Sequence, residues 1–221
     1  MFVPLKKLAR AVRFLRARGE TEAHSRSFVV ERQFVCLDRL FDDLLEAGQL
    51  HLGRMTLALE QIDLRRLVED VVESVRPRAI VKCQTLEVYL PAETVWMEAD
   101  PVRLQQVVSN LLVNGIKYTQ PGGRVSIDLA RRFGDAVLTV RDTGRGITAD
   151  LLPHVFEPFI RAADAPDAGL GVGLAIARQI VELHGGTIGA SSAGAGNGSE
   201  FVVTLRARPP NEPYSRGANC L

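Results

Sequence analysis

The chain has 221 residues, of which 46% are hydrophobic and 24% are charged, a composition typical of folded globular proteins that excludes wholesale disorder. Its 27 Lys and Arg residues nearly balance its 26 Asp and Glu residues, and the formal charge of +1 gives no electrostatic case for nucleic-acid binding. No apolar run approaches the roughly 20 residues that span a bilayer, and the three widely spaced cysteines fit neither a disulfide framework nor a metal site, so we expect a cytoplasmic chain without a membrane span.

Two amphipathic helices are expected within residues 1–52. The first carries an apolar stripe formed by Leu5, Leu8, Val12 and Leu15. A second stripe follows a short polar loop and is formed by Val30, Phe34, Leu37, Phe41 and Leu44. Two such helices predict an antiparallel hairpin, and pairing two hairpins in a dimer would bury both stripes in a four-helix bundle. Packing on the chain's own second domain is the alternative for the hairpin, and a transit peptide is the alternative for its Arg-rich start.

Residues 53–206 are expected to form one domain, in which strands and helices follow each other without strict βαβ alternation. The expected helices cover residues 63–77, 100–118 and 170–184, with Asp63 and Asp100 as their capping signals and Pro77 as an end signal. The expected strands cover residues 55–60, 86–90, 95–97, 125–129, 137–140, 187–191 and 201–205. This order predicts an α+β fold, an α/β sandwich with a mixed sheet and helices on one face. Residues 207–221 are polar and rich in Pro and Gly, which predicts a disordered tail.

Three polar side chains share one face of the helix expected at 100–118. Asn110, Asn114 and Lys117 are spaced four and three residues apart, which places them on neighbouring turns. An amide oxygen is a hard, neutral ligand that suits Mg²⁺, and an ammonium group nearby suits phosphates. A solvated polar face is the alternative interpretation.

Two glycine-containing segments follow. Asp142-Thr143-Gly144-Arg145-Gly146 comes directly after an expected strand, where its glycines allow a ligand to approach the backbone closely. Gly169, Gly171 and Gly173, followed by Leu174, open the last helix, where bare N–H groups and the positive end of the helix dipole would face an anion. This second segment lacks the Gly-Lys-Ser/Thr ending of a P-loop, and no βαβ unit precedes it as a dinucleotide fold would require.

An aromatic segment lies between the two glycine-containing segments. Phe156-Glu157-Pro158-Phe159 is followed by Arg161 and a stretch of small residues. Aromatic residues around a proline, before such a stretch, are typical of the anchor of a lid.

The order of these four segments resembles the N, G1, F and G2 boxes of the ATP-binding domain of sensor histidine kinases. These kinases belong to bacterial two-component systems, and their ATP-binding domain is shared with heat-shock chaperone and gyrase ATPases. The resemblance extends over about residues 4–206, because residues 31–45 resemble the second helix of the family's dimerisation domain and residues 181–186 and 198–201 resemble its closing segments. It implies a protein histidine kinase that uses ATP and Mg²⁺. It also implies a homodimer, or a heterodimer with another histidine kinase, formed through the hairpin, with a response regulator or partner kinase as the further partner.

The resemblance also implies roles for the helix residues. Asn114 would coordinate Mg²⁺, Asn110 would help to place the metal and the phosphates, and Lys117 would contact phosphate. Tyr118 would lie against the adenine, and Asp142 would accept a hydrogen bond from the adenine amino group. Chaperone and gyrase relatives have a water-activating glutamate at the position of Asn110, and an amide cannot act as that base, which favours a kinase over a hydrolase.

The remaining implied roles belong to the loops. Gly144 and Gly146 would shape the nucleotide pocket together with Phe159 and Leu174. Arg161 would reach the γ-phosphate when the lid closes and would act in catalysis with Asn110 and Lys117. The lid hinge and the phosphate-facing helix end would be formed by Gly169, Gly171 and Gly173.

The start of the chain departs from the family pattern. The family's acceptor histidine lies in a His-Glu-x-x-Asn-Pro-Leu stretch, and Val3-Pro4-Leu5 aligns with its end, so the aligned histidine would fall two residues before Met1. The chain's own histidines are expected to be structural or solvated; they are His24, His51, His154 and His184. We therefore expect no phosphoacceptor in these residues and phosphoryl transfer in trans to a partner kinase. The alternatives are a non-catalytic regulator that pairs with intact kinases, an anti-sigma-type serine kinase, and a start codon upstream of Met1.

Overall fold

The computed structural model describes residues 56–160 and 170–207 of the chain. Within these ranges the polypeptide forms one five-stranded sheet, one two-stranded ribbon and three α-helices, with a short 3₁₀ helix at Leu152–His154. The hairpin predicted for residues 1–52 lies outside the described residues, as does the tail predicted for 207–221 beyond its first residue.

The five-stranded sheet has the order β2-β4-β5-β7-β6. Its strands are β2 (Thr85–Tyr89), β4 (Arg124–Arg132), β5 (Asp135–Asp142), β6 (Thr187–Ser191) and β7 (Ser199–Arg206). Strands β2 and β4 are parallel, whereas the other neighbouring pairs are antiparallel. The register of β5 with β7 places Asp142 opposite Ser199 at one end and Asp135 opposite Arg206 at the other. This mixed sheet confirms the predicted fold class.

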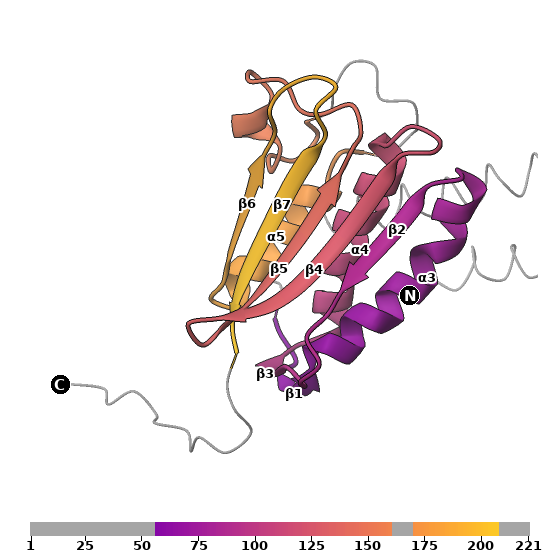
Figure 1. Cartoon of the computed structure of the whole chain (residues 1–221). Coiled ribbons are helices and arrows are strands. Elements are labelled where there is room, and N and C mark those ends of the chain that lie inside the picture. Colours follow the sequence, from indigo (N-terminus) through magenta and orange to yellow (C-terminus); the bar gives the residue numbers. More distant parts are fainter. Residues whose placement is uncertain (1–55, 161–169, 208–221) are drawn as a thin grey trace, which may run out of the picture.

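All three helices lie on the same face of the sheet (Figure 1). They are α3 (Leu64–Val81), α4 (Pro101–Tyr118) and α5 (Gly173–Leu183). The core lies between the two layers, because every second residue of a strand points to the helices. In β4, for example, Val125, Ile127 and Leu129 are buried, while the residues between them are not. Each such buried side chain contributes about 1.5–3 kcal/mol to folding.

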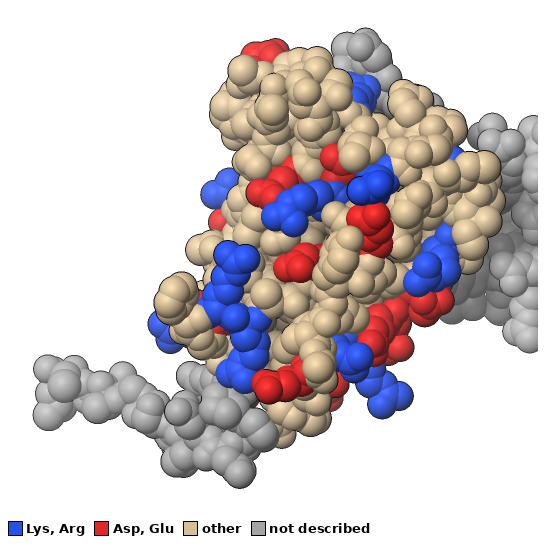
Figure 2. Space-filling model, viewed as in Figure 1, with Lys and Arg blue, Asp and Glu red and all other residues tan. Residues whose placement is uncertain are grey.

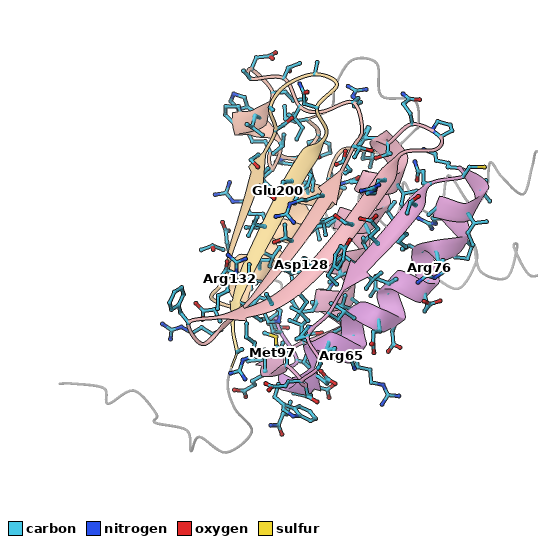
Figure 3. The ribbon with its side chains drawn as sticks, viewed as in Figure 1. Arg65, Arg76, Met97, Asp128, Arg132 and Glu200 are labelled. Atoms are coloured by element: carbon cyan, nitrogen blue, oxygen red, sulfur yellow. The ribbon has the colours of Figure 1, made fainter. Side chains whose placement is uncertain are left out.

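The opposite face of the sheet carries no described helix and is polar. Asp128 and Glu200 project from it (Figure 3). Figure 2 shows acidic and basic side chains side by side across this face, and Arg124 pairs there with Glu87 at 3.2 Å. Sheets with one buried and one solvated face show this alternation along each strand.

A two-stranded antiparallel ribbon leads into the helices. It consists of β1 (Glu60–Asp63) and β3 (Trp96–Ala99). Each strand leads to an aspartate that caps the next helix, Asp63 as the last residue of β1 and Asp100 directly after β3. The Asp63 carboxylate accepts the Arg65 N–H at 3.0 Å, and the Asp100 carboxylate accepts the Arg103 N–H at 3.1 Å. The two predicted capping signals are therefore confirmed.

Several predicted boundaries were wrong, among them those of β3, β4, β5 and β7, and three further ones have a clear physical reason. Strand β1 begins at Glu60 and not at residue 55, because the preceding Ala58 N–H donates to the Asp100 carboxylate at 2.9 Å instead of to a neighbouring strand. Helix α3 continues through Pro77 to Val81. The proline costs the helix one hydrogen bond, but the turn after it buries Ala79, and this burial favours continuation. Helix α5 begins at Gly173 and not at residue 170, because Gly171 has a φ of 75° that a right-handed helix does not contain. The predicted bounds of α4 (from Pro101 to Tyr118) and β6 are confirmed.

Candidate functional site

The described motif residues gather where the C-terminal half of α4 meets the end of β5 and the start of α5. Asn110 contacts the first residue of α5, and Tyr118 contacts the loop that follows β5. Three segments that are far apart in the sequence therefore meet at the end of the sheet where β7 begins.

The polar face of α4 remains partly accessible. Asn110, Asn114 and Lys117 are half-buried, whereas Leu111 and Leu112 on the other side of the helix are fully buried. The Asn110 amide nitrogen donates to the Gly173 carbonyl at 3.0 Å, which turns its oxygen away from that carbonyl. The hydrogen bond fixes the amide and joins α4 to the first turn of α5.

Two cations lie against the ring of Tyr118. The Lys117 ammonium is 5.1 Å from the ring centroid, and the Arg145 guanidinium is 5.6 Å from it. The backbone N–H of Arg145 also donates to the Tyr118 carbonyl at 3.2 Å. Each cation–π contact contributes about 0.5–1 kcal/mol at an exposed site. Sequence reasoning assigned no role to Arg145, although it lies within the Asp142-to-Gly146 segment.

Asp142 is a half-buried carboxylate at the end of β5. One of its oxygens accepts the Gly144 N–H at 2.8 Å, and the other accepts the hydroxyl of Ser199. Burial raises the pKa of Asp142 and outweighs the lowering by these hydrogen bonds, so the net shift is upward. Ser199 was missed as a site residue, and the available signal was its place in the closing segment 198–201.

The segment from Asp142 to Gly146 requires glycine for steric reasons. A Cβ atom on Gly144 would lie 2.4 Å from the Tyr118 carbonyl oxygen. Gly146 has a φ of 69°, and a Cβ atom there would lie 2.1 Å from the Gly194 carbonyl oxygen. Both distances are below any normal contact, so the backbone of this loop is pressed directly against two other segments.

Residues 192–198 hold this loop in place and were not predicted to do so. The Gly198 N–H donates to the Gly144 carbonyl at 3.1 Å, and the Ser192 hydroxyl accepts the Ile147 N–H at 3.0 Å. Ser192 also donates to the Gly198 carbonyl at 2.6 Å. Both loops are thereby fixed as one unit beneath Tyr118.

A backbone hydrogen bond joins Phe159 and Gly171, which lie in the described residues before and after 161–169. The Phe159 N–H donates to the Gly171 carbonyl at 3.1 Å. Phe159 has a φ of 68°, and its side chain is 57% exposed. Phe156 packs edge-to-face on Phe201 of β7, with ring centroids 6.3 Å apart. Two further predicted site residues, Arg161 and Gly169, lie outside the described residues, and Leu174 packs against the core.

The residues present fit a Mg-nucleotide. The glycine loop packs directly on the Tyr118 backbone, Asp142 supplies an acceptor, and Tyr118 supplies an aromatic face. Among residues 56–160 and 170–207, no cluster of three or more His, Cys, Asp or Glu side chains could hold a metal ion. A Mg²⁺ ion at this site would therefore depend on amide oxygens such as that of Asn114 and on the phosphates of the ligand.

The two histidines in the described ranges are engaged in hydrogen bonds. The His184 Nδ1–H donates to the Ile180 carbonyl at 2.7 Å, and its Nε2 accepts the Asp100 N–H at 3.0 Å. Both ring nitrogens of His184 are thus occupied, in the neutral form protonated on Nδ1. The exposed His154 lies 2.8 Å from a carboxylate oxygen of Glu157. His24 and His51 lie outside the described residues.

Comparison with known proteins gives one family. Residues 99–209 match the model of the histidine kinase-, DNA gyrase B- and HSP90-like ATPases. The sensor protein DivL of Caulobacter vibrioides is 36% identical over 173 residues, which cover 76% of this chain and 22% of DivL. The sensor protein kinase PmrB of Pseudomonas aeruginosa is 32% identical over 218 residues, which cover 97% of this chain and 45% of PmrB. The chain thus spans less than half the length of these relatives.

A solved structure has the same fold. The crystal structure of full-length ShkA in complex with AMPPNP matches with a TM-score of 0.80 and 27% sequence identity, covering 96% of this chain and 44% of that chain. No helix in the described parts of the chain combines the length and the apolar character needed to cross a membrane.

Proposed function

The chain belongs to the family of histidine kinase-, DNA gyrase B- and HSP90-like ATPases and has the ATP-binding catalytic core of a sensor histidine kinase, and from this premise we propose that it binds Mg-ATP and transfers the γ-phosphoryl group to a protein histidine. The observation that carries the proposal is the Asp142 carboxylate, which Gly144 and Ser199 hold at the start of the loop that binds the Tyr118 carbonyl through the Arg145 backbone N–H. A carboxylate oxygen accepts more than one hydrogen bond, so Asp142 keeps capacity for the adenine amino group.

The base would lie between Asp142 and Tyr118. Tyr118 offers its ring to the adenine, and the glycines at 144 and 146 let the loop after Asp142 pack closely on the backbone of Tyr118 and Gly194. Ser199 is the residue that orients the carboxylate, since its hydroxyl donates to the oxygen that Gly144 does not bind.

The phosphates would lie along the polar face of α4. Lys117 places an ammonium group there, and the Asn114 amide oxygen is the proposed protein ligand of Mg²⁺, which supplies charge neutralisation between the phosphate oxygens. Asn110 fixes the start of α5 through Gly173, where the first N–H groups of the helix are available to an anion. Arg161, Gly169 and Gly171 keep their predicted roles at the γ-phosphate and the lid hinge.

Phosphoryl transfer, rather than hydrolysis, is supported by the residue at position 110. An amide does not act as a general base, and the Asn110 amide nitrogen is already committed to the Gly173 carbonyl. The proposed nucleophile is the imidazole of a protein histidine, which needs no water activation by this helix.

The acceptor histidine is proposed to belong to a partner chain. His184 uses both ring nitrogens within the fold, and His154 lies beside Glu157, so neither is placed as an acceptor. Dimerisation through residues 1–52, a response regulator as the recipient of the phosphoryl group and a cytoplasmic location remain proposals.

Incubation of the purified 221-residue chain with γ-labelled Mg-ATP tests the proposal, with Asn114→Ala as the blank. The chain is incubated alone and together with a full-length histidine kinase whose own ATP site has been inactivated. We expect acid-labile label on the added kinase and none on the chain itself. Label on this chain would contradict transfer in trans, and ATP binding without any transfer would leave an ATP-binding regulator as its function.

A further inference from the structure

The C-terminal end of α4 has every one of its last four carbonyls hydrogen-bonded. An α-helix ordinarily leaves these groups without partners inside the helix. In α4 they belong to Ile116, Lys117, Tyr118 and Thr119, since the Thr119 N–H makes the last helical hydrogen bond, to Gly115 at 3.1 Å. The Tyr118 carbonyl accepts the Arg145 N–H, and the other three accept side-chain donors.

Two residues of a single connection supply these side-chain donors. The Lys82 ammonium lies 2.9 Å from the Ile116 carbonyl oxygen and 2.8 Å from that of Lys117. The Gln84 amide nitrogen lies 3.0 Å from the Ile116 oxygen and 2.7 Å from the Thr119 oxygen. Both residues belong to the connection between α3 and β2, which lies at the same end of the molecule as the end of α4 (Figure 1). An ammonium group at this position also complements the negative end of the helix dipole.

The connection is itself held rigidly. Its first residue, Lys82, accepts the Gly122 N–H at 3.2 Å, and Thr85 donates to the Gly123 carbonyl at 2.9 Å. The Gln84 side chain is only 8% exposed. Its amide oxygen has no hydrogen-bond partner among the described residues, so what this buried side chain supplies to the fold is its amide nitrogen.

The helix turn that is held in this way carries two proposed nucleotide contacts. Lys117 and Tyr118 are proposed to contact phosphate and adenine, and the Tyr118 carbonyl is also where the Gly144 loop packs. We propose that Lys82 and Gln84 are positioning residues of the nucleotide site, which act through the backbone of this last turn and do not touch the nucleotide. The inference rests on the proposed function, because it assigns its effect to ATP binding.

Removal of the donors tests the inference in the full 221-residue chain. The variants are Lys82→Met and Gln84→Met, and the measurement is the ATP dissociation constant by calorimetry. We expect either variant to weaken ATP binding about tenfold, the equivalent of one lost hydrogen bond of the stronger kind. Arg78→Met removes a cation from the exposed last turn of α3, and Gln105→Met removes an amide from the exposed face of α4, so both controls should stay within about twofold of the wild type.

A double-mutant cycle separates positioning from a general loss of stability. If Lys82 acts through the turn that carries Lys117, Lys82→Met should cost much less affinity in a Lys117→Ala background than in the wild type. Lys82→Arg, which keeps the donors and the charge, should restore most of the binding. Additive effects in the cycle would overturn the inference, as would unchanged affinity in a folded Lys82→Met variant.

The failure of the proposed function would look different. A wild-type chain that does not bind ATP would refute that function, whereas normal wild-type binding with unaffected variants would refute only the positioning role. Circular dichroism and thermal melting establish that each variant is folded. If Lys82→Met does not fold, Gln84→Met with Lys117→Ala provides the same cycle with the same criteria.

Discussion

Each oxygen of the Asp142 carboxylate already accepts one hydrogen bond from its own chain, and this makes its substitution informative. In Asp142→Asn one oxygen becomes an NH₂ group, which would face either the Gly144 N–H or the adenine amino group as donor against donor. We expect ATP affinity to fall about 30- to 100-fold, the cost of an unpaired buried donor. Thermal melting should show no loss of stability, because burial already disfavours the charged carboxylate. A strongly lowered melting temperature would contradict this account.

The same carboxylate predicts a pH dependence of binding. Burial raises the pKa of Asp142 from its ordinary value of 3.8, so the group gains its proton at a higher pH than a free aspartate. As the pH falls towards that raised pKa, an acceptor for the adenine amino group is lost, and ATP affinity should decrease. Titration of the dissociation constant between about pH 4 and pH 8 measures the effect, and Asp142→Asn should lack it.

The role of Gly144 can be tested with Gly189, a glycine of β6, as the matched control. Gly144→Ala would bring a Cβ atom to 2.4 Å from the Tyr118 carbonyl oxygen, whereas a Cβ atom on Gly189 meets nothing within 4 Å. Gly144→Ala should lower the free energy of unfolding by about 2 kcal/mol and weaken ATP binding, because the loop must move away from Tyr118. Gly189→Ala should leave both within error of the wild type in urea unfolding and calorimetry.

Helix α4 is fixed at both ends by contacts with other elements. Its first turn is capped by Asp100, whose carboxylate accepts N–H groups from Arg103 and from Ala58 and whose own N–H donates to His184. Its last turn is closed by Lys82, Gln84 and the Arg145 N–H. The helix that carries the proposed phosphate and metal contacts is therefore clamped to the rest of the domain.

The cap at Asp100 predicts a stability loss with a defined pH dependence. The side chain is 6% exposed, and Asp100→Ala removes a helix cap and a second hydrogen bond, for a loss of about 2–3 kcal/mol in the free energy of unfolding at pH 7. Burial by itself would raise the pKa of Asp100, but the N–H groups of Ala58 and Arg103 outweigh it, and the net pKa is lowered from 3.8. The charged carboxylate therefore stabilises the fold above the ordinary pKa of an aspartate, and this contribution is lost as the pH falls through the lowered pKa.

Urea unfolding at several pH values measures this effect. The difference between the wild type and Asp100→Ala should be largest near neutral pH and should shrink below about pH 4. His154→Ala, at an exposed position, serves as a control that should change stability by less than about 0.5 kcal/mol. A difference that stays constant down to pH 3 would show that the charge of Asp100 does not contribute.

Helix α4 also shows what the sequence could predict. Its bounds followed from local signals, the Asp100-Pro101 start and the proline and glycines after Gln120. The end of α3 did not, because the helix continues through Pro77 on account of the tertiary burial of Ala79. The residues next to a helix end predict that end correctly where no tertiary contact from elsewhere in the chain overrides them.

The site residues likewise divide into those that a short motif reveals and those whose partners are distant in the sequence. Asn110, Asp142 and the glycines were found because each lies in a short, ordered motif. Ser199 and Gln84 were not found, since their partners Asp142 and Thr119 lie 57 and 35 residues away in the sequence. Such contacts depend on the register of β5 with β7 and on how α3 returns to the sheet, which no short window of sequence contains.

The molecule as a whole should be stabilised by its ligand. At a free ATP concentration of about 100 times the dissociation constant, binding to the folded state alone adds about 2.7 kcal/mol to the free energy of unfolding. If Asn114 contributes to a magnesium site, the increase in melting temperature should be larger with Mg²⁺ than with a chelator. The Asn114→Ala variant should show little difference between the two conditions, and an unchanged Mg²⁺ dependence would remove Asn114 from the metal site.

The direction of β7 determines where a label or a tether can be attached to the protein. This strand starts at Ser199 beside Asp142 and ends at Arg206 beside Asp135, while the chain enters the domain at Ala58 against the opposite end of α4 from Tyr118 (Figure 1). The two described ends of the domain thus lie on the side away from the proposed nucleotide site. A fluorescent protein or a surface tether attached after residue 207 would stand clear of the base, so nucleotide exchange could be followed on immobilised molecules without obstructing the pocket.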